Sequence, residues 1–360
     1  MRVTFVVPDL GDTSGGARII AGHAERLAER GHEVLIVSPN PPRVDLRRRL
    51  KSLIGRDRLP PPPEHSHYAR LKVTNRRTGR DGPVEAKDVP DADVIIATFW
   101  TTVEWIWSMP PTKGAKVHFI QGYDAAAGRP NDQIDAAWRS PFHKIAVAQW
   151  LVDLGKDRFG SDRIALVPNS IDHHLFNPLN RPARTKPATI GFMFHAADFK
   201  DMPTSLAAIA RLKQIHPETN IVSFGASMPR RGELPPATRF YHLPKQEKIA
   251  EIYSRCDAWL STSRLEGFNL PPLEAMATGC PAVCARTGRP LEIINNGRNG
   301  FLIDQGDSAG FADALSGIVS LDDDAWHRMS DSAVEAVAHP TWKESSFLFE
   351  KALIGSVVAK

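Results

Sequence analysis

The sequence has few cysteines and no long hydrophobic run, and these absences exclude several classes of protein. Its 360 residues include three cysteines, Cys256, Cys280 and Cys284. They are too few for a disulfide framework, and no second pair or nearby histidine completes a zinc set. No apolar stretch approaches the roughly 18 residues that a membrane-spanning helix needs. We therefore expect reduced thiols in a cytosolic protein without membrane spans.

The sequence also lacks internal repeats, and its opening does not match a secretory signal. Pro8 and Asp9 interrupt the apolar residues at the start, so we expect a first β-strand at 2–7 instead. Apart from "PPPP" at 60–63, which marks a loop, no low-complexity tract occurs. With 42% hydrophobic and 24% charged residues the chain is globular, and its length suggests two domains.

Positive charge is concentrated in the first half of the chain. Residues 43–80 contain 12 basic and 3 acidic side chains, which predicts an anionic partner. Within this segment, 44–59 places leucines and Ile54 on one helical face. Basic residues flank that face: Arg47, Arg48, Arg49 and Lys51. Such a helix suits an anionic membrane surface; the alternative is a solvated helix packed on its own domain. No aromatic residues alternate with the basic ones, so we expect no nucleic-acid partner.

Strand-like and helix-like segments alternate along the chain. Apolar runs typical of buried parallel strands occupy, in the first half, 2–7, 33–39, 93–98, 116–121, 144–148 and 163–169. After a Pro-rich, basic segment at 176–188 the pattern restarts, with strand candidates at 189–194, 220–225, 239–243, 258–262, 281–285 and 300–303. This α/β pattern predicts two Rossmann-like domains whose parallel sheets face a cleft. Segment 176–188 is the predicted linker.

A glycine pair opens the first predicted helix. Gly15 and Gly16 lie between the first strand and a helical stretch that ends at Gly31, where a helix C′ residue is expected. Glycines at a helix start allow a ligand to approach the backbone closely. A plain tight turn is the alternative. The spacing does not match G-x-G-x-x-G, so no dinucleotide fingerprint is present.

Two glutamates, Glu266 and Glu274, stand eight residues apart in "EGFNLPPLE". Pro271 and Pro272 predict the start of a short helix, which would place Glu274 in its first turn. The N–H groups at a helix start favour a phosphate, whereas carboxylates on either side of it would accept hydrogen bonds from hydroxyl groups. The pattern therefore favours a ligand with a diphosphate between two polyols, which is a nucleotide-sugar.

The stretch "EGFNLPPLEAMATGCPAV" resembles the E-x7-E signature of retaining GT-B glycosyltransferases, in particular glycosyltransferase family 4. The resemblance covers nearly the whole chain, because four further segments follow in the family's order: "SGGA" (14–17), "VPNSID" (167–172), "HAADFKD" (195–201) and "GRPLEIINNGRNGFLI" (288–303). It implies an acceptor-binding domain at 1–182 and a donor-binding domain at 183–341. A final helix at about 342–360 would pack back on the first domain.

The resemblance also implies roles for particular residues. Glu274 would bind the ribose hydroxyls, and Glu266 would orient the transferred sugar. Lys200 would grip the diphosphate together with His195, which stands where the family has an arginine. Other donor contacts would come from Gly15, Gly16, Gly267, Phe268, Asn269 and Leu270. The alternatives are two surface glutamates, a solvated lysine and a packing histidine.

The first domain departs from the family's pattern near the reacting sugar. The family often has a histidine after the strand at 116–121, where this chain has Gln121 followed by Asp124. These two residues are the candidates for that position, while His118 is expected to be buried in the strand. We predict no metal and no cofactor besides the nucleotide-sugar. Asp91 and Asp93 mimic D-x-D at the wrong end of a strand, and Asp322–Asp324 reads as a helix N-cap.

The resemblance implies a retaining transferase that moves a hexose-type sugar from a nucleoside diphosphate sugar to a glycan or lipid-linked acceptor. We expect it in bacterial surface polysaccharide or glycolipid synthesis, cytoplasmic or peripheral on the inner face of the cell membrane. The alternatives are a nucleotide-sugar epimerase or phosphorylase of the same fold, and a non-catalytic protein that binds sugar nucleotides.

Overall fold

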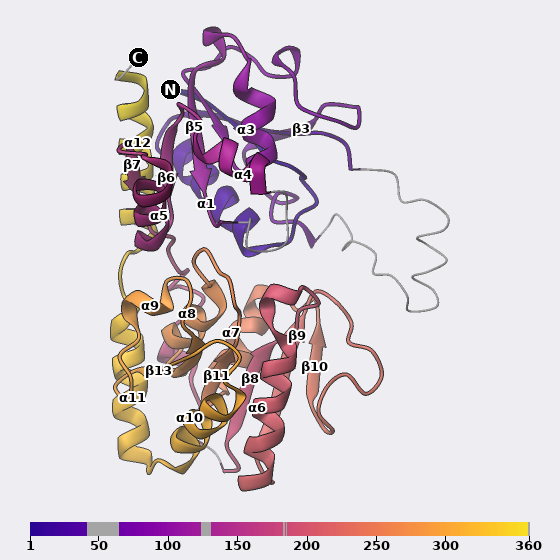
Figure 1. Ribbon diagram of the computed structural model, residues 1–360, viewed down its shortest axis with the longest axis vertical. Coiled ribbons are helices and arrows are strands. Elements are labelled where there is room, and N and C mark those ends of the chain that lie inside the picture. The colour runs from indigo at the N-terminus through magenta and orange to yellow at the C-terminus, as the bar shows by residue number, and fades with distance from the viewer. Residues whose placement is uncertain (42–64, 124–130, 183, 185, 359–360) are drawn as a thin grey trace. The chain divides into compact units, whose positions relative to one another are not determined.

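The computed structural model describes residues 1–41, 65–123, 131–182, 184 and 186–358, which form two compact domains (Figure 1). The first domain contains Met1–Asn169 and Lys343–Lys360, and the second contains Ser170–Trp342. Both are α/β domains built on parallel sheets, as predicted. Two predicted features lie outside the described residues: the basic helix at 44–59, with Arg47, Arg48, Arg49 and Lys51, and the candidate site residue Asp124.

A seven-stranded parallel sheet forms the centre of the first domain, in the order β3-β2-β1-β4-β5-β6-β7. Its strands are β1 (Arg2–Val6), β2 (Glu33–Ser38), β3 (Thr74–Arg77), β4 (Val94–Ala97), β5 (Ala115–Ile120), β6 (His143–Ala146) and β7 (Ile164–Leu166). All but β3 were predicted, because long apolar runs mark strands that are covered on both faces. The polar sequence "TNRR" carries no such signal, and β3 forms only by pairing with β2 at the sheet's edge.

The helices of the first domain are α1 (Gly15–Glu29), α3 (Trp100–Trp107), α4 (Asn131–Trp138), α5 (Gln149–Phe159) and α12 (Trp342–Val358), with short 3₁₀ turns η2 (Ala86–Asp88) and η3 (Pro111–Lys113). Ser14 caps α1, since its Oγ accepts a hydrogen bond from the Ala17 N–H at 3.2 Å. Gly31 follows the C-cap with φ +87°, which confirms its predicted place at C′.

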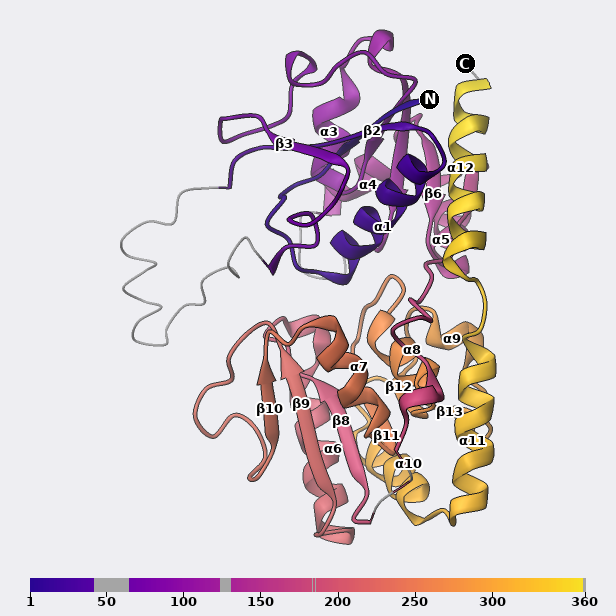
Figure 2. The ribbon, with the colours of Figure 1, turned by 180° about the vertical axis from the view of Figure 1, so that it is seen from behind.

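The C-terminal helix α12 belongs to the first domain (Figure 2). The ring of Phe349 lies 4.2 Å from that of His23 and 5.0 Å from that of Phe119, measured between ring centroids. Beside it, Glu350 accepts a hydrogen bond from Arg30 Nε at 2.7 Å, and this bond lowers the pKa of the Glu350 carboxyl. Apolar packing and an ion pair therefore hold α12 against α1 and the sheet.

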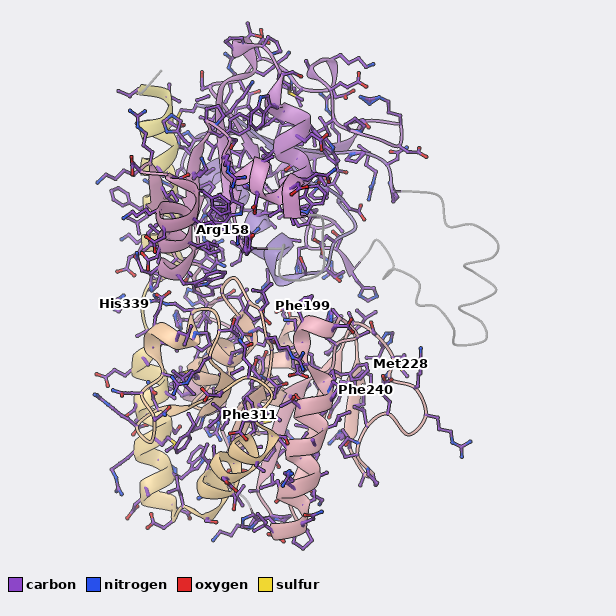
Figure 3. The ribbon with its side chains drawn as sticks, in the orientation of Figure 1. Arg158, Phe199, Met228, Phe240, Phe311 and His339 are labelled. Atoms are coloured by element: carbon purple, nitrogen blue, oxygen red, sulfur yellow. The ribbon has the colours of Figure 1, made fainter. Side chains whose placement is uncertain are left out.

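The second domain contains a six-stranded parallel sheet in the order β10-β9-β8-β11-β12-β13. Its strands are β8 (Thr189–Met193), β9 (Asn220–Gly225), β10 (Arg239–His242), β11 (Ala258–Ser261), β12 (Ala282–Ala285) and β13 (Gly300–Ile303). Its helices are α6 (Met202–Ile215), α7 (Gln246–Ser254), α8 (Leu270–Ala277), α9 (Pro290–Ile293), α10 (Ser308–Ser320) and α11 (Asp323–Ala336), with 3₁₀ turns η5 (Pro178–Asn180) and η6 (Asp198–Lys200). Phe311 of α10 is fully buried in its core (Figure 3).

The boundary between the domains lies at 169/170, so the predicted boundary at 182/183 and the predicted linker at 176–188 are wrong. The segment is instead anchored in the second domain. The ring of Phe176 packs 5.9 Å from that of Tyr253, and Arg181 donates a hydrogen bond of 2.7 Å to the Cys256 carbonyl. Prolines and basic residues are typical of linkers, but Phe176 and Arg181 are held by contacts with distant residues that no local pattern predicts.

The three cysteines are free of disulfides and buried, as predicted. Burial raises the pKa of the Cys280 thiol to about 12, so this side chain stays protonated and unreactive at neutral pH. Over the described ranges, each helix is too short or too polar to cross a lipid bilayer.

Candidate functional site

Three loops meet at one edge of the second sheet, and two of them carry most of the candidate residues. The three loops follow β8, β11 and β12, which are neighbours in a parallel sheet, so their carboxyl ends meet. Lys200 and Phe199, the latter labelled in Figure 3, lie in the first of these loops, and Glu266 lies in the second. A small hollow at this edge is lined by residues that include Met193, Lys200, Ser261, Thr262, Asn269 and Pro271.

The fold brings Lys200 and Glu266 into direct contact, although 66 residues separate them. Lys200 Nζ donates a hydrogen bond of 2.5 Å to Glu266 Oε1, and the two side chains are only 13% and 12% exposed. An ion pair this far removed from water is stronger than a surface pair, and each charge depends on its partner. Neither residue is a solvated surface charge, which removes that alternative for both.

Helix α8 begins at Leu270, before the two prolines that predicted its start. It runs from Leu270, with Asn269 as N-cap at φ +69°, so Glu274 lies in the second turn and its predicted place in the first turn is wrong. The prolines occupy positions 271 and 272 and have no N–H to offer. Of the four N–H positions that a helix start leaves without an intrahelical partner, only Asn269 and Leu270 therefore carry a donor.

Glu274 is held from the opposite side by an aromatic cluster. Its side chain is 4% exposed, and Oε2 accepts a hydrogen bond from the Tyr253 hydroxyl at 3.3 Å. The Tyr253 ring packs edge-on against Trp259 with 4.6 Å between centroids, which fixes the position of the hydroxyl. Glu274 is therefore a buried carboxylate with a fixed orientation and not a surface glutamate.

His195 follows β8 and is held by its own loop. Its Nδ1 accepts a hydrogen bond from the Ala197 N–H at 3.0 Å, and its ring centroid lies 6.0 Å from that of Phe199. A neutral imidazole with Nδ1 as acceptor carries its proton on Nε2. That nitrogen is of the kind that can donate a hydrogen bond to an anion.

In the first domain, the structure joins two other candidates. Gln121 Nε2, just after β5, donates a hydrogen bond of 3.3 Å to the Gly16 carbonyl at the start of α1. Gly15 and Gly16 are the first residues of that helix, as predicted. His118 is 4% exposed within β5, and burial lowers its pKa to about 3, which confirms that it is a core residue.

Both domains match known families. A family profile described as "Glycosyltransferase Family 4" matches residues 13–175, and one described as "Glycosyl transferases group 1" matches residues 179–335. The chain belongs to glycosyltransferase family 4. The predicted resemblance is confirmed at the level of the family, and the protein is a transferase enzyme.

Curated relatives of this glycosyltransferase differ in what they are named for. It is 27% identical over 308 residues to D-inositol 3-phosphate glycosyltransferase of Corynebacterium jeikeium, an alignment that covers 72% of this chain and 71% of the relative. It is 30% identical over 224 residues to glycogen synthase of Mycobacterium tuberculosis, covering 55% of this chain and 53% of the relative. The aligned part is therefore about half of the second relative's length.

Solved structures establish the fold of this glycosyltransferase as GT-B. The sucrose-phosphate synthase of Thermosynechococcus elongatus superposes with a TM-score of 0.76 at 18% identity, covering 100% of both chains. Anabaena HepE in complex with UDP-glucose superposes with a TM-score of 0.72 at 17% identity, covering 99% of this chain and 100% of HepE. The predicted fold class, two Rossmann-like domains of the GT-B type, is confirmed.

The loop after β12 supports the Glu266 loop of the glycosyltransferase, and this role was not predicted. Glu266 N donates a hydrogen bond of 3.1 Å to Thr287 Oγ1, and Arg289 N donates one of 3.0 Å to the Phe268 carbonyl. Between them, Gly288 has φ +67°, and a Cβ built there would lie 3.1 Å from both Glu266 Cβ and the Phe268 carbonyl oxygen. The resemblance of 288–303 to the family was the only signal for this support.

We expect Gly288→Ala to disturb the site more than strain alone would. A left-handed alanine costs about 1–2 kcal/mol, which corresponds to a fall in Tm of about 2–8 °C for a domain of this size. The added methyl group also presses on Glu266, so turnover should fall by at least tenfold. Gly297→Ala is the matched control, because Gly297 has φ +79° and nothing within 4 Å of a built Cβ. Equal activity losses in the two variants would contradict this reading.

The acidic pairs that mimic metal motifs have structural partners. Asp93, directly before β4, accepts a hydrogen bond from the Arg2 N–H at 2.7 Å, and Asp91 accepts one from Lys113 at 3.0 Å. Asp322 caps α11, as predicted, by accepting a hydrogen bond from Ala325 N at 2.7 Å. These acids hold strand and helix ends in place.

Proposed function

We propose that this glycosyltransferase moves a hexose-type sugar, with retention of configuration, from a nucleoside diphosphate sugar to a glycan or lipid-linked acceptor. The observation that carries the proposal is the largely buried pair of Lys200 and Glu266. It combines a cation for the diphosphate with a carboxylate for the sugar, beside the start of α8. A surface with neither a fixed cation nor a fixed carboxylate could bind a nucleotide, but it could not recognise both the diphosphate and the sugar of the donor.

The diphosphate would be bound by two side chains and several backbone N–H groups. Lys200 supplies a point charge that suits phosphate oxygens. His195 Nε2 and the backbone amides of Gly267, Phe268, Asn269 and Leu270 would donate hydrogen bonds to the same oxygens. As the bond between the sugar and the diphosphate breaks, negative charge grows on the leaving group. These donors stabilise that charge in the transition state.

The two glutamates would accept hydrogen bonds from hydroxyl groups. Glu274, held by the Tyr253 hydroxyl, would bind the ribose, and Glu266 would orient the sugar that is transferred. In a front-face displacement, the acceptor oxygen forms its bond to the anomeric carbon on the side from which the diphosphate leaves. A phosphate oxygen takes the acceptor's proton, so no further base is required.

The first domain would contribute contacts near the transferred sugar and a basic segment that binds lipid. Gly15, Gly16 and Gln121, which the structure joins, and Asp124 would lie near the transferred sugar. Lys200 would stabilise the charge of the leaving diphosphate in place of a metal ion, so turnover should persist in the presence of EDTA. The basic segment with Arg47, Arg48, Arg49 and Lys51 would bring the enzyme to anionic lipids on the inner face of the membrane. That placement favours bacterial surface polysaccharide or glycolipid synthesis.

A panel of nucleoside diphosphate sugars tests the proposal. A donor at about 100 times its Kd adds about 2.7 kcal/mol of stability, which predicts a rise in Tm of about 5–10 °C for a domain of this size. The best donor is then incubated with and without candidate acceptors, and the products are analysed. Transfer that depends on an acceptor supports the proposal. Conversion of the donor alone would indicate an epimerase, and binding without any conversion would indicate a sensor.

A further inference from the structure

Arg264 and Asp201 form a second ion pair beside the first. Asp201 directly follows Lys200 in the chain, and Arg264 stands two residues before Glu266. Arg264 Nε and Nη2 donate to the two carboxylate oxygens of Asp201 at 2.9 and 3.2 Å. This two-pronged geometry fixes both side chains more firmly than a single hydrogen bond would. The pair therefore joins the loop that carries Lys200 to the loop that carries Glu266.

Asp201 uses its carboxylate in an unusual way for its position. It is the N-cap residue of α6, where an aspartate ordinarily accepts a hydrogen bond from a helix N–H. Its side chain makes no such bond. The carboxylate, in a residue only 2% exposed, instead accepts hydrogen bonds from Arg264 and from Thr204 Oγ1, the latter at 2.8 Å. The carboxylate therefore bonds to the first turn of α6 through a side chain and not through a helix N–H, and its charged partner comes from another loop.

The backbone of Asp201 is strained. Its φ is +48°, in the left-handed region that an aspartate occupies at a cost of about 1–2 kcal/mol. Glycine would adopt this conformation freely. An aspartate here is consistent with a requirement for its carboxylate, and the carboxylate's charged partner is Arg264.

Two hydrogen bonds to backbone carbonyls also hold these loops together. Arg264 N donates a hydrogen bond of 2.7 Å to the Phe199 carbonyl, and Thr262 Oγ1 donates one of 2.9 Å to the Asp201 carbonyl. Arg264 itself is 59% exposed, so its side chain adds little to the core. The loops can therefore stay attached without the arginine, while their exact spacing depends on the ion pair.

We propose that Arg264 and Asp201 are positioning residues that set the distance between Lys200 and Glu266, and thereby the affinity of the site for the diphosphate of the donor. The inference rests on the proposed function. A lysine side chain is long and flexible, so the place of its charge is determined by the loop that carries it. A misplacement of about 1 Å in a binding group is enough to change rates about 100-fold.

Binding of nucleoside diphosphates tests the inference. UDP, GDP and ADP serve as probes, and the tightest is titrated calorimetrically into wild type, Lys200→Ala, Arg264→Ala, Asp201→Gly, and the two double variants that combine Arg264→Ala with each of the others. We expect Arg264→Ala and Asp201→Gly each to raise Kd about tenfold. The Arg264→Ala/Asp201→Gly variant should also raise Kd only about tenfold, because both substitutions break the same ion pair. In the Lys200→Ala background, Arg264→Ala should change Kd by less than twofold.

Two further variants separate positioning from folding. Arg255→Ala removes a similarly exposed arginine that pairs with Glu251 on α7, and should leave Kd and turnover unchanged. Arg264→Lys keeps the positive charge but loses the two-pronged hydrogen bonding of the guanidinium. It should give an intermediate Kd, with a Tm close to that of wild type. Asp201→Gly should fold, because glycine suits the left-handed backbone.

The outcomes distinguish the inference from the proposed function. If Lys200→Ala weakens binding and Arg264→Ala stays within twofold of wild type, the inference is wrong and the proposed function stands. If Arg264→Ala weakens binding as much in the Lys200→Ala background as in wild type, Arg264 acts directly on the ligand and the inference is also wrong. If wild type binds none of the probes, the proposed function fails and the inference falls with it.

Discussion

Replacing Glu266 with glutamine is expected to lower kcat by about 10²–10³-fold, the range seen when one preorganised electrostatic contact is removed from a transition state. The carboxylate is held against Lys200 at 2.5 Å and is barely exposed, so its position is fixed before the donor binds. Glu266→Ala should lower kcat at least as far. The measurement is single-turnover transfer from the donor that the panel identifies.

The same variant should bind a nucleoside diphosphate at least as tightly as wild type. The Glu266 carboxylate is bonded to the Lys200 ammonium. The negative charge of Glu266 therefore competes with a phosphate for that cation. Loss of kcat with unchanged or lower Kd would therefore separate a catalytic role from damage to the fold. Glu335→Ala, which removes an exposed glutamate on α11, is the control and should match wild type. A Glu266→Gln enzyme with more than a tenth of the wild-type kcat would contradict the assignment.

Replacing Lys200 with alanine should lower kcat/KM by about 10²–10³-fold, through a higher KM and a lower kcat together, because the lysine contacts the diphosphate both in the bound donor and as the leaving group. A charge-assisted hydrogen bond contributes about 1.5–3 kcal/mol, which is about 10–100-fold in affinity. A further loss follows because Glu266 is left as an uncompensated carboxylate that repels the diphosphate. Donor KM and the Kd of the nucleoside diphosphate are the two measurements.

Lys248→Ala is the matched control for this variant. Lys248 also pairs with a glutamate in the second domain, at 2.7 Å from Glu251, but lies on the surface of α7. It should leave Kd and KM unchanged. Lys200→Arg should recover part of the affinity, because the charge returns with a different shape. Wild-type Kd in Lys200→Ala would show that the diphosphate binds elsewhere.

Most of the architecture could be predicted because buried parallel strands have a strong local signature. Val94–Ala97 and Ala282–Ala285 are buried along their whole length, as apolar runs in strands covered on both faces are. Strand β3 lacked that signature, since "TNRR" is polar and its pairing depends on β2. Its position is decided by a neighbour in the sheet and not by its own residues.

The start of α8 shows where a local pattern misleads. Pro271 and Pro272 marked a helix start, but with the left-handed Asn269 as N-cap the helix already begins at Leu270. The Asn269 side chain donates a hydrogen bond to Ser261 Oγ at 3.1 Å, at the end of β11. Because that contact is between loop and strand, a search for helix-starting residues cannot find it. Glu274 moves into the second turn as a result.

The sequence by itself determined the two α/β domains, the family and the candidate residues Lys200, Glu266 and Glu274, because each depends on residues close together in the chain. Only the tertiary structure decided that Lys200 bonds to Glu266 and that Arg264 bonds to Asp201. The same is true of the support that Thr287 and Gly288 give to the Glu266 loop. These contacts join segments that follow different strands. They form because neighbouring parallel strands end at one edge of the sheet, which brings distant loops together.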